Sequence, residues 1–127
     1  MTHIPKLKWR FAIGTTSLVP STNPRRHYLI LDIDTKDVDE VNHTIGYLKN
    51  IIGCSMVSCH ETQRGWHIYT PTQYSWSILL DVLRCVPNVD RNWLRIGKRR
   101  GYLFLADKDY FYPNWPVIRM FIRYGKN

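Results

Sequence analysis

The chain has 127 residues, of which 44% are hydrophobic and 22% charged, and its formal net charge is +8. One domain of ordinary globular composition is expected at this length, which excludes a disordered tail, a collagen-like repeat and a coiled coil. No apolar run reaches the roughly 18 residues of a membrane helix and no signal-peptide core precedes the domain, so we expect a cytoplasmic protein without membrane contact.

The first half of the chain predicts an arm, a strand and a helix. Residues 1–26 form a basic arm and a loop rich in Thr, Ser and Pro, and residues 27–127 form the single folded domain. A short apolar strand is expected over 27–34. It is followed by a helix over 36–52, with its apolar residues on one stripe and Gly53 as its end.

The second half predicts more strands around one more helix. Residues 54–60 and 65–70 form a strand pair, and a helix over 75–86 follows. Two further strands are expected over 92–97 and 102–106, joined by the basic turn Lys98-Arg99-Arg100-Gly101. The tail over 109–127 is not assigned, except that Val117–Tyr124 suits a last strand.

This order predicts an α+β fold of the split βαβ type, as in ferredoxin-like and RRM-like domains. One antiparallel sheet would carry two helices on one face and leave the other face open, with one extra strand added. The open face is where function is expected, but fold alone does not choose among functions.

Alternation along the first strand places two carboxylates on that open face. Leu29, Leu31 and Ile33 share one fully apolar face and must pack on the helices. Asp32 and Asp34 then project together, roughly 6–7 Å apart at about 3.3 Å per residue. Two carboxylates this close favour a divalent cation such as Mg²⁺ or Mn²⁺ between them. The alternative is that Asp34 only caps the following helix.

Cations and aromatic rings are predicted beside this pair. On the 65–70 strand His67 faces the open side and suits a phosphate oxygen, and Arg64-Gly65 before it offers a cation and a close backbone approach. On the 92–97 strand Trp93 and Arg95 would face out for stacking and phosphate contact. The alternatives are an ordinary surface histidine and a solvated basic hairpin tip.

The charge pattern points to the same class of partner. Residues 1–31 carry five Lys and Arg and no acid, residues 32–90 carry four against eight Asp and Glu, and residues 91–127 carry nine against two. Two basic arms around an acidic middle favour a polyanion partner, most often nucleic acid. A solubilising surface charge is the alternative.

Taken together, the segments HYLILDID, ETQRGWHIYT and VDRNWLRIGKRRGYLFL resemble the catalytic core of the archaeo-eukaryotic primase superfamily, over about residues 27–105. That group includes the primase small subunit and the primase-polymerases of plasmids and viruses. Its Asp-x-Asp motif is matched by Asp32 and Asp34, and its Arg-Gly-aromatic-His motif in part by residues 64–67. Its third acid is matched by Asp90.

The resemblance implies a nucleotidyltransferase of DNA replication that joins (d)NTPs on a single-stranded DNA template. Asp32, Asp34 and Asp90 would hold Mg²⁺ or Mn²⁺, and His67 with Arg64 would contact the triphosphate. Triphosphate or template backbone would be held by Arg95, Lys98, Arg99 and Arg100. A helicase or accessory primase subunit would come from another chain. On a strand over 92–97, Asp90 reaches the open face only if the strand starts after it.

Four other interpretations stay open. A non-catalytic, RRM-like binder of single-stranded nucleic acid would need only the basic arms and the aromatic residues. A rolling-circle nuclease would need paired histidines on one strand, where this sequence has only His67. A protein-binding module would bind DNA weakly and without preference. Zinc held by Cys54, Cys59, His60 and His67 would have none of the usual ligand spacings.

Overall fold

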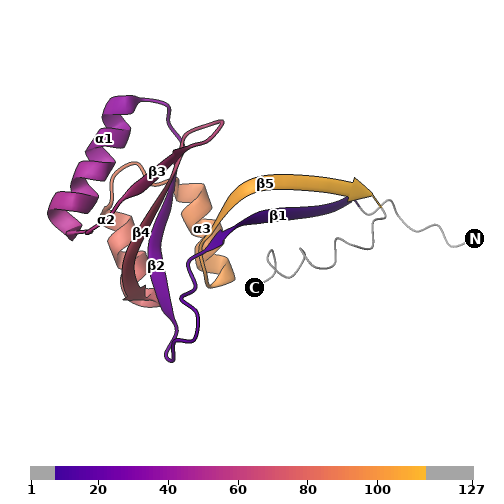
Figure 1. Cartoon of the computed structure of the whole chain (residues 1–127), viewed down its shortest axis with the longest axis horizontal. Coiled ribbons are helices and arrows are strands. Elements are labelled where there is room, and N and C mark those ends of the chain that lie inside the picture. The colour runs from indigo at the N-terminus through magenta and orange to yellow at the C-terminus, as the bar shows by residue number, and fades with distance from the viewer. Residues whose placement is uncertain (1–7, 114–127) are drawn as a thin grey trace, which may run out of the picture. The chain divides into compact units, whose positions relative to one another are not determined.

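The computed structural model describes residues 8–113, and the side chains of residues 14–106. It is an α+β fold, as predicted, with antiparallel sheets of three and two strands and three α-helices in the described part (Figure 1). The elements in chain order are β1 (Lys8–Thr16), β2 (Arg26–Ile33), α1 (Val38–Tyr47), the π-helical turn η1 (Leu48–Ile52), β3 (Ser58–Glu61), β4 (Trp66–Ser75), α2 (Trp76–Cys85), α3 (Arg91–Arg100) and β5 (Phe104–Pro113).

The chain divides into two compact units. Residues Thr16–Leu105 form one unit, which holds the three-stranded sheet, the helices and every residue of the predicted site. Strands β1 and β5 pair with each other and belong mostly to the second unit. The predicted strand Val117–Tyr124 lies outside the described residues. Among the helices that are described, none has the length and apolarity that a membrane crossing requires.

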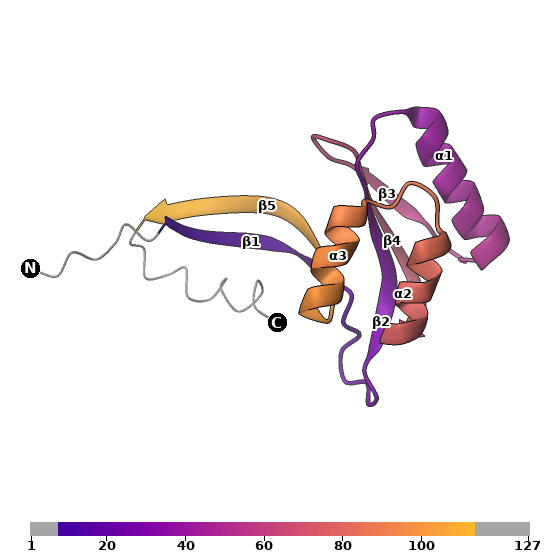
Figure 2. The same ribbon diagram turned by 180° about the vertical axis from the view of Figure 1, so that it is seen from behind.

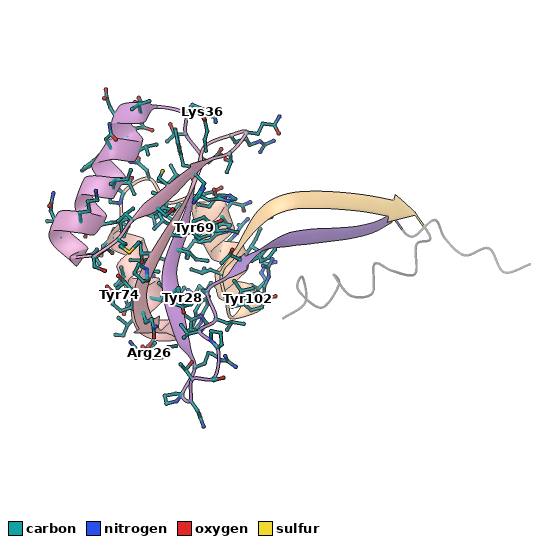
Figure 3. The ribbon with its side chains drawn as sticks, in the orientation of Figure 1. Arg26, Tyr28, Lys36, Tyr69, Tyr74 and Tyr102 are labelled. Carbon is teal, nitrogen blue, oxygen red and sulfur yellow. The ribbon has the colours of Figure 1, made fainter. Side chains whose placement is uncertain are left out.

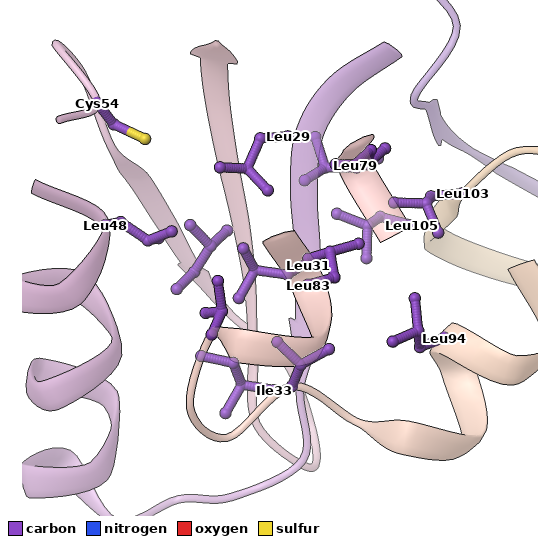
Figure 4. Close-up of a cluster of buried hydrophobic side chains, with 14 of the residues drawn as sticks. Leu29, Leu31, Ile33, Leu48, Cys54, Leu79, Leu83, Leu94, Leu103 and Leu105 are labelled. Atoms are coloured by element: carbon purple, nitrogen blue, oxygen red, sulfur yellow. The ribbon is translucent and has the colours of Figure 1, made fainter. Parts of the chain in front are cut away.

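Strand β2 forms one side of the core, and the face that it buries is the one that alternation predicts. Leu29, Leu31 and Ile33 are fully buried and form one cluster with side chains from all three helices (Figure 4). Helices α2 and α3 lie behind the sheet in Figure 1 and in front of it in Figure 2, so they cover the same face. The opposite face carries Asp32, and it is closed to solvent at Ile30, which is 2% exposed.

The strand order β2-β4-β3 confirms the pairing of the two predicted strands and places β4 in the centre, but β3 covers only Ser58–Glu61, so the predicted strand over 54–57 is wrong. Strand β4 is longer than predicted because it continues past Pro71 to Ser75. A bulge accommodates this proline, since the register shifts between Tyr28 and Ile30. The Thr70 hydroxyl donates to the Leu29 carbonyl at 2.8 Å within the irregular stretch. The sheet thereby bends without losing its core face.

The first two helices are confirmed, with small changes at their ends. Helix α1 begins at Val38 because Asp37 caps it, accepting from the Asp39 and Glu40 amides. Gly53 ends the helical run at φ 83°, the left-handed conformation that glycine adopts without strain. Val38, predicted on the apolar stripe, is 60% exposed because it lies in the first turn, outside the contact with the sheet.

The predicted strand over 92–97 is wrong, because these residues form helix α3. Asp90 caps its N-terminus, accepting from the Asn92 and Trp93 amides at 3.0 and 3.2 Å, and Gly101 ends it at φ 91°. Ile96, which would alternate with Arg95 and face the core on a strand over 92–97, is 43% exposed. Lys98, Arg99 and Arg100 therefore form a last helical turn, where cations favour the helix dipole, rather than a hairpin tip.

His27 joins β2 to the segments that flank the sheet. Its Nδ1 lies 2.8 Å from the Ser17 hydroxyl, whose oxygen accepts from the Leu103 amide at 2.9 Å. The Ser17 proton is therefore available to a neutral imidazole. Burial, and secondarily the charge of Arg25, lower the pKa of His27 below its ordinary value of 6.5.

The lowered pKa of His27 predicts acid sensitivity. A depressed folded-state value contributes stability above pH 6.5 that is lost as the pH falls through the folded pKa. We expect the wild type to lose more unfolding free energy than His27→Asn, which keeps an acceptor near Ser17, between pH 7.5 and 5.5. Urea denaturation of both proteins at the two pH values measures this difference. Parallel losses would mean that His27 has the same pKa in the folded and the unfolded protein, and would contradict the lowered value.

Candidate functional site

The open face of the sheet carries a row of side chains from three strands. Asp32 on β2 lies opposite His67 on β4, and His67 lies opposite His60 on β3. Directly opposed residues of antiparallel strands point to the same face. The His67 Nε2 atom lies 3.6 Å from Asp32 Oδ1, so this row brings together two residues that the sequence placed in the site.

His60 is the member of this row that the sequence interpretation missed. Its Nε2 lies 2.9 Å from the Ser58 hydroxyl, and its ring meets that of Tyr69 edge-on at 5.4 Å (Tyr69 is labelled in Figure 3). The length of the turn could have revealed this residue. If residues 62–65 connect the two strands, His60 lies opposite His67. Paired histidines therefore exist, but across two strands rather than along one.

Three acidic residues, Asp32, Asp34 and Asp90, lie near the end of β2. Asp34 follows the strand directly, and the segment before α3 runs along the free edge of β2, where Val89 bridges Ile33. The Asp90 amide donates to the Asp32 carbonyl at 2.8 Å. Asp90 therefore lies beside Asp32 because its segment pairs with the edge of β2. The sequence interpretation had required a strand that starts after Asp90.

The electrostatics of this group follow from burial and like charge. The pKa of Asp32 is raised to about 6, chiefly by burial and then by the negative charges of Asp90 and Asp34. The Asp32 side chain is only 24% exposed, so water screens these charges incompletely. A carboxylate in such surroundings is costly to ionise without a cation beside it.

The donor set suits a hard divalent cation in its chemistry, but its side chains are not gathered as ligands. Carboxylate oxygens are the ligands that Mg²⁺ and Mn²⁺ prefer. Within the described residues, however, no three His, Cys, Asp or Glu side chains lie together as a metal-holding group. Both hydrogen bonds of the Asp90 carboxylate go to its Oδ1, in the cap of α3. Asp32, Asp34 and Asp90 can be named as candidate ligands of an ion, but the described side chains define no coordination geometry.

The Arg64-Gly65 turn is held against the end of β2. A Cβ atom at Gly65 would lie 1.8 Å from the Ile33 carbonyl oxygen, so only glycine fits there. The Thr62 hydroxyl accepts from the Gly65 amide at 3.0 Å. Arg64 is exposed on this turn. Gly65 therefore has a packing role that is independent of any nucleotide.

Lys36 ties the same turn to the start of α1. Its ammonium group lies 3.0 Å from Glu61 Oε2, donates to the Thr62 carbonyl, and sits 5.8 Å from the centre of the Trp66 ring (Figure 3). The turn that carries Arg64 is thus fixed from both sides, beside the carboxylates of β2.

The remaining predicted site residues lie on or beside α3 and not on the open face. Trp93 is half-buried, and its indole N–H donates to the Phe104 carbonyl at 2.7 Å, so it packs the helix rather than offering a free ring. Arg100 lies over the Tyr102 ring at 5.2 Å. Arg95, Lys98 and Arg99 are exposed on the helix. The sequence interpretation placed Trp93 and Arg95 on a strand of the sheet, and Lys98, Arg99 and Arg100 in the turn after it, because α3 was predicted as a strand.

No family model matches the chain, and neither a curated protein nor a solved structure shows significant similarity to it.

Proposed function

We propose that the chain is a nucleotidyltransferase of DNA replication, similar to a primase or primase-polymerase, which joins (d)NTPs on a single-stranded DNA template with Mg²⁺ or Mn²⁺. The observation that carries this proposal is the meeting of Asp32, Asp34 and Asp90 from two distant chain segments at the end of β2. Their order along the chain matches the primase motifs that the sequence resembles.

The physical support is that these acids are arranged at a cost. Neutral side chains would fold at least as well at a site where burial, and after it the like charges of Asp90 and Asp34, raise the pKa of Asp32 to about 6. Such destabilised groups are typical of functional sites. In this class of reaction a divalent cation neutralises the triphosphate and activates the attacking 3′-hydroxyl. Asp32, Asp34 and Asp90 are the residues that would hold it.

The chain's other site residues would orient the nucleotide. His67 faces Asp32 at 3.6 Å and can donate a hydrogen bond from its ring to a phosphate oxygen beside the carboxylates. Arg64 extends from a turn that Lys36 and Gly65 hold in place, so a guanidinium is available at the same end of the sheet. Both would bind and position the triphosphate.

Nucleotide incorporation on circular single-stranded DNA tests the proposal. With Mg²⁺ or Mn²⁺, the wild type should extend an annealed primer, and products without a primer would make it a primase. The variant Asp32→Ala/Asp34→Ala should lose at least about 100-fold in rate, because metal-dependent charge stabilisation contributes several kcal/mol. The matched control Asp39→Ala/Asp81→Ala removes two exposed carboxylates from helices α1 and α2 and should keep the wild-type rate. Equal rates in all three proteins would reject the proposal.

A second candidate is a non-catalytic binder of single-stranded nucleic acid in replication. It is favoured by the absence, among the described residues, of side chains already gathered around a metal position. In this case the incorporation assay gives no product, and DNA binding is unchanged in Asp32→Ala/Asp34→Ala. A helicase or accessory primase subunit would come from another chain in either case.

A further inference from the structure

Helix α3 presents a stripe of cations that the described part of the chain does not neutralise. Arg91, Arg95, Lys98 and Arg99 recur at helical spacing, within an arc of about 100° and over about 12 Å of axis. All four are exposed. None of them lies within ion-pair distance of a carboxylate among the side chains described, those of residues 14–106, where the ion pairs are those of Lys36, His67 and Arg84.

The opposite side of α3 explains why this stripe faces solvent. Leu94 and Gly97 are buried against the core, and the Trp93 ring is fastened to the Phe104 carbonyl. Arg91 is anchored at one end of the stripe, donating to the Leu83 and Arg84 carbonyls at the end of α2. The helix therefore cannot rotate to hide its charges.

The fold needs only part of this charge. Lys98, Arg99 and Arg100 complement the dipole at the C-terminus of α3. That explanation does not cover Arg95, which lies in the middle of the helix. Arg91, at the start of α3, donates instead to the carbonyls at the end of α2. Among the described side chains Arg95 donates to Asn92 of its own helix, at 2.5 Å. Neither the dipole of α3 nor an ion pair with a described side chain accounts for the charge of Arg95, so it is available to a negatively charged partner.

We infer that this stripe, called here the α3 stripe and defined as Arg91, Arg95, Lys98 and Arg99, binds the phosphate backbone of a nucleic-acid strand. A single line of cations matches a single row of phosphates, and three of the four are Arg, which suits paired contact to phosphate oxygens. At about 3.4 Å per nucleotide, 12 Å of helix spans about three phosphates.

The stripe begins beside the carboxylate site, since the residue before Arg91 is Asp90, whose amide bonds to Asp32. A strand bound along α3 therefore runs toward or away from the end of β2. The inference extends the proposed function, because it names the surface that would hold the template. The binding itself needs neither metal nor nucleotide, so it can be tested separately.

A nucleic-acid strand fits the stripe better than a lipid surface does. Membrane-bound helices of this kind insert an apolar face into the bilayer, whereas the apolar face of α3 is buried in the core. Of its apolar residues only Ile96 is exposed, at 43%.

The test is the salt dependence of binding to a labelled 20-nucleotide single strand, followed by fluorescence anisotropy in EDTA. The variant Arg95→Gln/Arg99→Gln should reduce the slope of log K against log salt by about 1.4 in magnitude, since each lost phosphate contact contributes about 0.7. Affinity at 50 mM salt should fall about tenfold or more. Glutamine keeps the helix propensity, and circular dichroism checks the fold.

The matched control is Lys49→Gln/Arg84→Gln, which removes the same charge from exposed positions on η1 and α2. It should leave the slope nearly unchanged. Equal loss in both variants would show a general charge effect and would overturn the inference. The inference would also be overturned if Arg95→Gln/Arg99→Gln weakened binding to vesicles of phosphatidylserine and phosphatidylcholine more than it weakened binding to DNA.

Two further arms separate this inference from the proposed function. A duplex of the same length tells whether the stripe binds the backbone of a single strand or of a paired one. If Arg95→Gln/Arg99→Gln changes the salt slope with neither probe, the inference is contradicted. Asp32→Asn should bind DNA as tightly as the wild type in EDTA. If incorporation is never observed but the α3 stripe variant loses DNA binding, only the catalytic proposal fails.

Discussion

Asp32→Asn is expected to stabilise the protein at pH 8 by about 1–2 kcal/mol in the absence of divalent cations, while reducing incorporation at least about 100-fold. The two effects have opposite signs because one carboxylate is costly to the fold and, in our proposal, necessary to the reaction. A substitution in a purely structural position would lower both quantities together.

The sign of the stability change follows from the raised pKa of Asp32, about 6 against 3.8 for the ordinary carboxyl. A raised folded-state pKa contributes stability that is fully present below the unfolded value and is lost as the pH rises through the folded value. The wild type should therefore lose stability relative to Asp32→Asn between about pH 4 and pH 6. Each pKa unit corresponds to about 1.4 kcal/mol, and we discount the total because the group retains contact with water.

Urea denaturation at pH 4.5, 6 and 8 measures this difference, with Asp39→Asn as the control. Asp39 is exposed in the first turn of α1, where its charge favours the helix dipole, so its removal should give no gain. If Mn²⁺ binds at these acids, adding it should raise the stability of the wild type more than that of Asp32→Asn. If Asp32→Asn were less stable than the wild type at pH 8, the assignment of Asp32 as a carboxylate that destabilises the fold would be contradicted.

Gly65→Ala is expected to destabilise the protein by about 3 kcal/mol, enough to prevent folding in a marginally stable domain. The added methyl group would meet the Ile33 carbonyl oxygen at 1.8 Å, its carbon at 2.8 Å and the Thr35 amide nitrogen at 2.9 Å. All three atoms are backbone at the end of β2, so no side-chain rotation relieves the contact.

Gly46→Ala provides a matched control within the same protein. Its new methyl group would find only the Asn50 amide nitrogen, at 4.0 Å, and alanine favours the helix. This variant should be more stable than the wild type by about 0.5–1 kcal/mol. Chemical denaturation of both variants checks the pair. A Gly65→Ala protein with wild-type stability would mean that the turn does not press against β2.

The sequence by itself determined the elements whose pattern is local. Three apolar residues alternate along β2, so its core face could be assigned without the fold, and all three are fully buried. The helical run of α1 and η1 could be placed because Gly53 marks its end, and helix α2 because Pro87 follows it. The shared face of Asp32 and His67 also followed, since both lie on the non-core side of their strands, whereas their direct opposition depends on the register.

The one misassigned helix shows where local signals conflict. Leu94 and Ile96 alternate like a strand, and Gly97 stands in the middle of the segment, where glycine costs a helix about 1 kcal/mol. Asp90 as a cap and Gly101 as a stop were the helical signals. Tertiary packing explains the glycine: a Cβ at Gly97 would lie 2.7 Å from the Leu103 side chain, so the following segment can cross closely only there.

The assembly of the site was decided by tertiary structure alone. Asp90 meets Asp32 across 58 residues of chain through one backbone hydrogen bond at the strand edge, and His60 joins His67 through register. No periodicity in the sequence predicts either contact, because both depend on how separate elements pack. Local sequence specified which residues are acidic, basic or apolar, and the packing of β2, β4 and α3 decided which of them are neighbours.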